Sequence, residues 1–149
     1  MSVAPLCRVT ADVIDVAGLL AAVPSPADGA VLLFLGIVRD ENDGRAVASL
    51  EYEAYAEMAE RKMREIADEA RGRWPVGEVA VVHRTGRLEI GEASVAIAVA
   101  SPHRVEAYEA SRYVIEELKR RVPVWKREGY VEGETRWVPG FTPAVEEGA

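Results

Sequence analysis

Two long segments of this chain repeat their apolar residues at helical spacing, and this pattern constrains the fold more than any other feature. One covers residues 56–74 and ends at Pro75, and the other covers residues 102–122 and ends at Pro123. Each segment predicts an amphipathic helix, which must bury one face against another element. The segments around them are short and apolar. The chain is therefore predicted to pack helices on a sheet.

The shorter segments predict the strands of that sheet and one further helix. Strands are expected over residues 6–10, 30–38, 47–55, 79–84, 94–100, 124–126 and 135–138, and a helix over residues 14–23. The run 30–38 is almost wholly apolar, which predicts a strand buried on both faces. Gly86 and Gly91 separate two apolar runs, which predicts a hairpin. The order of elements predicts an α+β fold with a mainly antiparallel sheet, whose two-helix core is similar to ferredoxin-like arrangements.

Length and charge narrow the class of protein. The 149 residues predict a single domain, residues 1–149, with residues 139–149 as a mobile tail. The formal net charge of -7 argues against general nucleic-acid binding, which needs a broadly basic face. No apolar run reaches the ~20 residues that span a bilayer, and residues 1–10 lack the pattern of a secretory signal. We therefore expect a cytoplasmic protein that binds neither nucleic acid nor a membrane.

Cysteine and histidine are scarce in this sequence. Cys7 is the only cysteine, which excludes an intramolecular disulfide and a multi-cysteine zinc site. His83 and His103 are the only histidines, so a His-rich metal site is not expected either. Cys7 lies in a strand-like run and is interpreted as a small buried hydrophobe, with a reactive thiol as the alternative. No metal site is therefore predicted.

The start of the second long helix carries cations where acidic residues are usual. Ser101 and Pro102 favour a helix N-terminus, which predicts that the helix begins at Pro102. His103 and Arg104 then fall in the first turn, at the positive end of the helix dipole. Their charge is unfavourable there unless an anion is bound. We therefore predict an anion site, most simply for a phosphate, at this helix start.

Cations also gather at the other end of the same helix. Lys119, Arg120 and Arg121 would complement the helix dipole as ordinary C-terminal charges, which is the simpler explanation for each of them. It does not explain Lys126, which lies beyond the proline that ends the helix. Like charges and partial burial lower the pKa of a lysine, which suits acid–base or nucleophilic chemistry near neutral pH. Lys119 and Lys126 are therefore the candidate catalytic residues.

The candidate cations lie too far apart for one small anion. A helix rises ~1.5 Å per residue, so Arg104 and Lys119 are separated by roughly 22 Å along it. Either the ligand is long, or the two ends belong to different pockets, or a second subunit completes the site. Arg39 is a further candidate, because a polar residue that follows a core strand is exposed. A homodimer that places one helix start near the other helix end would resolve the distance.

Several short blocks resemble the large, catalytic subunits of molybdopterin synthase. The blocks are FLGIVR (34–39), EYEAY (51–55), ARGRWP (70–75), HRTG (83–86), SPHR (101–104), AYEA (107–110), LK (118–119), PVWKRE (123–128) and RWV (136–138). Their order and spacing together carry the resemblance, which covers residues 34–138. Some members have a basic residue shortly after the last block, whereas this chain has Pro139-Gly140, so no role is transferred there.

The resemblance implies a sulfurtransferase of molybdenum-cofactor biosynthesis. Members convert cyclic pyranopterin monophosphate into molybdopterin by inserting two sulfurs as a dithiolene. The sulfur arrives as a thiocarboxylate on the C-terminal Gly-Gly of a small ubiquitin-like partner subunit. Two large subunits form the central homodimer of a heterotetramer, and no cofactor is bound permanently. The implied fold is an α/β hammerhead with an additional antiparallel β region.

The resemblance also assigns roles to individual residues. Lys119 and Lys126 correspond to the catalytic lysines of the family. Residues that hold the substrate's anionic groups or line its site correspond to Ile37, Val38, Arg39, His103, Arg104, Arg127 and Glu128. A single cysteine agrees with an enzyme whose sulfur comes from a partner.

Two other functions are compatible with the residues alone. One is a non-catalytic, ferredoxin-like sensor of an anionic metabolite, which needs the helix-start anion site but not two lysines. The other is a structural interaction module, which predicts that Lys119 and Lys126 are exposed with no pocket between them.

Overall fold

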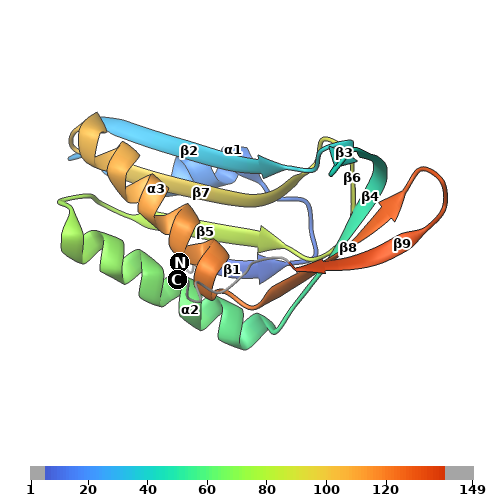
Figure 1. Ribbon diagram of the computed structural model, residues 1–149. Helices are drawn as coiled ribbons and strands as arrows, with labels where there is room; N and C mark the ends of the chain where they lie inside the picture. The colour runs from blue at the N-terminus through green and yellow to red at the C-terminus, as the bar shows by residue number, and fades with distance from the viewer. Residues whose placement is uncertain (1–5, 140–149) are drawn as a thin grey trace.

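The computed structural model describes residues 6–139 and contains three helices packed on two sheets (Figure 1). The helices are α1 (Val16–Ala22), α2 (Ala56–Arg73) and α3 (Arg104–Arg121). The strands are β1 (Cys7–Thr10), β2 (Ala30–Ile37), β3 (Glu41–Asn42), β4 (Arg45–Ala54), β5 (Val79–Arg84), β6 (Gly86–Glu89), β7 (Ala93–Ser101), β8 (Val124–Tyr130) and β9 (Thr135–Pro139). The predicted α+β class is therefore confirmed.

The first sheet carries the main core. Its strand order is β1-β5-β7-β2, with β1 parallel to β5 and the other pairs antiparallel. Helices α2 and α3 lie on one face and α1 on the other (Figure 1). The larger core cluster joins Met63 and Ile66 of α2 with Val114 of α3 over Val81 and Ile97 of the sheet. The last turn of α3 is thereby held against the end of the sheet.

The second sheet lies beyond that end and completes the frame of the site. Its order is β3-β4-β8-β9, and β6 pairs with β4 off this path. In the β4–β8 ladder, Tyr52 pairs with Lys126 and Leu50 pairs with Glu128. A separate apolar cluster, which includes Val38 and Leu88, lies beneath this sheet. The ladder therefore places Lys126 and Glu128 of the PVWKRE block beside Tyr52 and Leu50 of β4.

Strand β2 differs from its predicted environment. The run 30–38 is predicted to be buried on both faces, but among the strands of residues 6–139, β2 is an edge strand that pairs only with β7. Its side chains are half-buried or exposed, and Ile37 retains 47% of its accessible area. An apolar composition cannot distinguish a central strand from an apolar edge, because the strand order is set by the whole sheet.

The predicted hairpin between residues 79–84 and 94–100 is only partly correct. These strands do pair antiparallel, as β5 and β7. The connection between them is not a simple turn, however, because its first residues form β6 and pair with β4. Gly86 and Gly91 have φ of 91° and 90°, a backbone conformation that favours glycine. Two short strands, β3 and β6, were therefore not predicted, and β8 extends to Tyr130 instead of ending at residue 126.

Helix α3 begins two residues later than predicted. Ser101 is the last residue of β7, where it pairs with Ala30, and is not a helix cap. Its hydroxyl donates to the carbonyl of His103 at 2.7 Å and stabilises the turn that leads into the helix. His103 is the N-cap residue and Arg104 the first helical residue. Strand pairing has therefore taken Ser101 away from the capping role that its type favours.

Four further predictions concern membrane-spanning helices, metal sites, Cys7 and the C-terminal tail. No helix within residues 6–139 is long and apolar enough to cross a membrane. The same residues contain no group of three His, Cys, Asp or Glu side chains placed to hold a metal ion. Cys7 is buried, as interpreted from the sequence. The predicted mobile tail lies outside the described residues from position 140 onward.

Candidate active site

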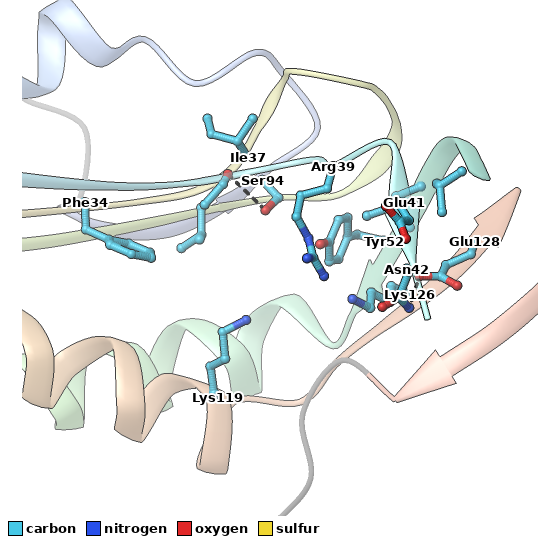
Figure 2. A pocket seen from close by; sticks show the side chains of 14 residues that line it. Phe34, Ile37, Arg39, Glu41, Asn42, Tyr52, Ser94, Lys119, Lys126 and Glu128 are labelled. Carbon is cyan, nitrogen blue, oxygen red and sulfur yellow. Dashed lines mark hydrogen bonds between the residues drawn. The ribbon is translucent and has the colours of Figure 1, made fainter. Parts of the chain in front are cut away.

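A polar pocket of about 190 Å³ lies where β2, β4, β8 and the end of α3 meet (Figure 2). Its wall combines a few apolar side chains with three cations, Arg39, Lys119 and Lys126. The residues that line it are Phe34, Gly36, Ile37, Arg39, Glu41, Asn42, Val47, Leu50, Tyr52, Ser94, Val95, Lys119, Lys126 and Glu128. The fold thus brings distant parts of the sequence to one site: Ile37 and Lys119, which are 82 positions apart, both line the pocket.

Lys119 projects from the last turn of α3 toward the pocket (Figure 2). Lys119 as a residue is exposed, but partial loss of hydration at its ammonium lowers the pKa, and the charge of Lys126 lowers it further. Within residues 6–139 no carboxylate lies within ion-pair distance of Lys119. The neighbouring Arg120 and Arg121, by contrast, are paired with acidic side chains. Lys119 therefore differs from its two neighbours in the last turn of α3, because it faces the pocket without an ion-pair partner.

Lys126 reaches the pocket from β8, and strand alternation explains its neighbours. Successive side chains of a strand point to opposite faces, so Lys126 and Glu128 share the pocket side. Arg127 lies on the other face, where it pairs with Glu51 and its guanidinium is 5.3 Å from the ring of Trp137. The structure therefore does not bring Arg127 to the pocket.

Glu128 is the buried carboxylate of the site. It is only 2% exposed, and both of its oxygens accept hydrogen bonds. The Asn42 side-chain amide donates to Oε2 at 2.5 Å, and the Tyr130 hydroxyl donates to Oε1 at 2.6 Å. Because Asn42 belongs to β3, this carboxylate ties the segment that follows β2 to the strand that carries Lys126.

Arg39 stands directly after β2 on that same segment. Its guanidinium faces the pocket beside Tyr52 (Figure 2). No carboxylate of the described chain comes within 4.0 Å of it. Ile37 lines the pocket as predicted, but Val38 points into the apolar cluster beneath the second sheet and is 3% exposed.

His103 and Arg104 lie at the opposite end of α3 from Lys119. Both are exposed, and neither lines the pocket of its own subunit. The separation of roughly 22 Å expected from helical rise is therefore present in the fold. One chain alone does not bring the predicted anion site and the lysines together.

Sequence reasoning missed several residues of the pocket. Tyr52, Phe34, Asn42 and Ser94 line the pocket but were not among the candidate site residues. Asn42 sits in a polar loop sequence that gives no sign of the two-residue strand β3. Tyr52 had one usable signal, since it alternates with acidic residues along its strand, but its neighbour Lys126 is known only from the ladder.

The pocket contradicts one of the alternative functions. A structural module with a merely solvated basic face predicts exposed lysines and no cavity between them. Lys119 is exposed and Lys126 half-buried, but both side chains line the same cavity. Three cations and two carboxylates, Glu41 and Glu128, line this cavity, and none of the three cations has a carboxylate within 4.0 Å in residues 6–139. A cavity with such an excess of unpaired cations favours an anionic small molecule. The fold and site thus define an α+β enzyme-like protein with an anion-binding pocket.

The chain belongs to the MoaE protein family, whose profile matches residues 9–121. A relative from Halalkalibacterium halodurans, a molybdopterin synthase catalytic subunit, is 50% identical over 113 residues, which are 76% of this chain and 72% of the relative. A Pyrococcus abyssi protein of the same name is 48% identical over 121 residues, which are 81% of each chain. The resemblance inferred from the sequence blocks is therefore confirmed.

Solved structures show the same relationship. The crystal structure of molybdopterin synthase from Staphylococcus aureus has a TM-score of 0.86 and 38% identity, and the match covers 91% of this chain and 98% of that one. A complex of subunits 1 and 2 of molybdopterin-converting factor from Helicobacter pylori shares the fold, with a TM-score of 0.75 at 21% identity, over 97% of this chain and 98% of that one.

Proposed function

We propose that this chain is the catalytic subunit of a molybdopterin synthase, and that Lys119 and Lys126 are its catalytic residues. The observation that carries the proposal is the meeting of these two lysines in one pocket, without carboxylate partners among the described residues. The substrate is a pterin with a cyclic phosphate, cyclic pyranopterin monophosphate. A sensor would need an anion site but not two such lysines, so the alternative of a non-catalytic sensor is not favoured.

The chemistry needs positive charge where negative charge develops. The thiocarboxylate sulfur forms a bond to a pterin carbon, which makes a thioester with the carrier. Water then adds to the thioester carbonyl, whose oxygen becomes negatively charged, and the acyl carbon–sulfur bond breaks to leave the sulfur on the pterin and a carboxylate on the carrier. The phosphate oxygen becomes charged as the cyclic ester opens. Cations held in a partly desolvated pocket stabilise such charge more strongly than water does. The two ammonium groups are assigned this electrostatic role. Proton transfer to the departing phosphate oxygen is the other role open to Lys119, because its pKa is lowered by burial and by Lys126.

The sulfur is proposed to come from a second protein. Cys7 is buried in the main core and does not line the pocket, and burial raises the pKa of its thiol, which disfavours the reactive thiolate. A small ubiquitin-like subunit with a C-terminal Gly-Gly thiocarboxylate fits this need, since glycine lets a backbone approach a catalytic group closely. The H. pylori neighbour is itself a complex of two subunits.

A second copy of this chain is proposed to supply the phosphate site. The pocket volume of about 190 Å³ lies below the ~300–1,000 Å³ usual for small-molecule sites, which favours a site that another chain completes. His103 and Arg104 are exposed at the far end of α3 and are thus accessible to a neighbour. In a homodimer, the helix start of one copy would face the lysines of the other, with Arg39 between them.

Reconstitution with a thiocarboxylated small subunit and the pterin precursor tests the catalytic assignment. Lys119→Ala is expected to lower turnover by roughly 10²–10⁴-fold, the usual effect of one positioned catalytic group, with an unchanged melting temperature. Arg120→Ala is the matched control, because Arg120 is the next residue on α3 and is paired with Glu117 on the surface. Turnover of Lys119→Ala within a few-fold of wild type would refute the proposal.

A mixed dimer tests the shared site. A heterodimer of one Lys119→Ala chain with one Arg104→Ala chain has one site with both defects and one intact site, if the site is shared. Such heterodimers are expected to recover about half of wild-type turnover, although both parent homodimers are impaired. If each site belongs to one chain, every site in the heterodimer keeps one defect and no turnover is recovered.

A further inference from the structure

A second, smaller cavity of about 40 Å³ lies beside the pocket and shares several of its walls. Lys119, Lys126, Tyr52 and Ser94 line both cavities, but His83 lines only the smaller one. A volume of this size has room for a single water molecule. A histidine is therefore placed at the inner side of the proposed catalytic lysines, and nothing described so far explains its presence there.

The orientation of the His83 ring is fixed. His83 is the polar residue near the end of β5, on the same face as Val79 and Val81, and is 5% exposed. Its Nδ1 lies 2.9 Å from the carbonyl oxygen of Arg84. The imidazole and the Tyr52 ring pack edge to face, with their centroids 5.1 Å apart. A carbonyl only accepts hydrogen bonds, so Nδ1 carries the ring proton.

The remaining nitrogen, Nε2, is consequently an acceptor with a free lone pair. Within residues 6–139 it has no hydrogen-bond partner of its own. Burial lowers the pKa of His83 to about 4, and the charge of Lys119 acts in the same direction. The imidazole is therefore neutral near pH 7, and a neutral acceptor next to an ammonium is a favourable pair.

We propose that His83 is a positioning residue: its Nε2 accepts a hydrogen bond from one water molecule in this cavity, and that water accepts one from the Lys119 ammonium, which keeps the lysine charged and aimed into the pocket. The inference deepens the proposed function and rests on Lys119 being its catalytic cation. Without such an acceptor, lost hydration and the repulsion of Lys126 act on Lys119 unopposed. His83 thus supplies what a carboxylate would supply elsewhere, but adds no negative charge that would repel an anionic substrate.

Other charged groups also face Lys119, and the test must separate them from His83. The pocket and the small cavity present Arg39 after β2, Glu41 on β3, Tyr52 on β4, and Lys126 and Glu128 on β8. All of these stay in place when His83 alone is changed. A change in the titration of Lys119 on substitution of His83 therefore reports the proposed pair.

The sequence makes a direct NMR titration practical, because it has three lysines, at positions 62, 119 and 126, and two histidines. In protein with isotope-labelled lysine, His83→Phe is expected to lower the titration midpoint of Lys119 by about one pH unit. His83→Gln keeps an acceptor close to the position of Nε2 and is expected to stay near the wild-type midpoint. Lys62 on α2 is the internal control and should not change.

The reciprocal experiment needs no His83 variant, which covers the case in which His83→Phe fails to fold. In Lys119→Met with isotope-labelled histidine, loss of the donor and of its charge should raise the pKa of His83. An unchanged Lys119 midpoint in folded His83→Phe, or an unchanged His83 pKa in Lys119→Met, would overturn the inference.

These titrations use the chain without substrate, so they separate two kinds of failure. If the titrations are uncoupled while Lys119→Ala is inactive, His83 has no positioning role but the proposed function stands. If Lys119→Ala retains turnover, the proposed function fails and a measured coupling has no catalytic meaning.

Discussion

Two cations in the last turn of α3, Lys119 and Arg121, have opposite surroundings, although they lie only two residues apart in the sequence. Arg121 makes a bidentate pair with Glu69 of α2 at 2.7 and 2.9 Å and also contacts Glu117. The Tyr113 hydroxyl donates to the same Glu69 carboxylate at 2.7 Å. Lys119 faces the pocket, where Arg39 and Lys126 are its cationic neighbours. Charges that are compensated hold α2 to α3, whereas those left without a carboxylate raise the affinity of the pocket for an anion.

The largest effect is expected from removing the second pocket cation. Lys126→Ala should lower turnover by about 10²-fold, equal to or somewhat less than Lys119→Ala, because it removes charge from the same site. Its melting temperature should match wild type, since no ion pair of the described chain is lost. A parallel fall in turnover and stability would place Lys126 with Arg121 among the structural cations. The reconstituted assay and a thermal melt measure both quantities.

The next effect concerns the carboxylate that joins the two strands of the site. Glu128→Ala leaves the buried donors of Asn42 and Tyr130 without an acceptor, which should cost about 1–3 kcal/mol in the free energy of unfolding. Urea titration measures this cost. Tyr130→Phe removes one of the two hydrogen bonds and is expected to cost less. Equal stability of Glu128→Ala and wild type would show that this carboxylate does not hold β3 to β8.

A smaller effect is expected at the compensated cations. Arg121→Ala should destabilise the protein by about 1 kcal/mol, because the pair is partly exposed and solvent screens much of its charge. Turnover per folded molecule should remain within a few-fold of wild type. A double-mutant cycle with Glu69→Gln isolates the pair from other losses. A large loss of turnover without loss of stability would mean that the Arg121–Glu69 pair also positions Lys119.

The smallest effect is the acid dependence of the same pair. Hydrogen bonds first from Arg121 and then from Tyr113 lower the pKa of Glu69 from 4.5 to about 2. Because the folded pKa lies below the unfolded one, this contribution is present above pH ~4.5 and is lost as the pH falls toward 2. Wild type should therefore lose its advantage over Glu69→Gln in that interval, by less than about 1 kcal/mol. Unfolding curves at pH 6, 4 and 3 test this, and a constant difference would contradict it.

The sequence predicts the charged residues of the candidate site better than the uncharged residues that line the pocket. Arg39 and Lys126 could be found because a cation after an apolar strand, or beyond a helix-ending proline, has no simple structural explanation. Phe34 and Ser94 could not, since their place in the wall depends on the strand order β7-β2. His83 is a polar residue on the apolar face of β5, shared with Val79 and Val81, and this break in the alternation is the local signal that could have singled it out.

The fold shows the same division between local and distant information. The two long helices end within one or two residues of their predictions, because prolines and apolar spacing are local signals. The edge position of β2 and the short strands β3 and β6 depend on partners far away in the sequence. No local pattern distinguishes such strands from loops.

The register of β8 against β4 decides which β8 side chains face the pocket, because alternate residues of a strand point to opposite faces. A shift of β8 by a single residue would preserve most backbone hydrogen bonds but would exchange the two faces of the strand. Trp125 and Arg127 would then enter the pocket, while Lys126 and Glu128 would leave it. Gly129 favours the observed register, because a Cβ at its place would lie 2.8 Å from the hydroxyl of Ser49, which would have to move. This strand should therefore accept many substitutions on its outer face but no single-residue insertion or deletion before Gly129.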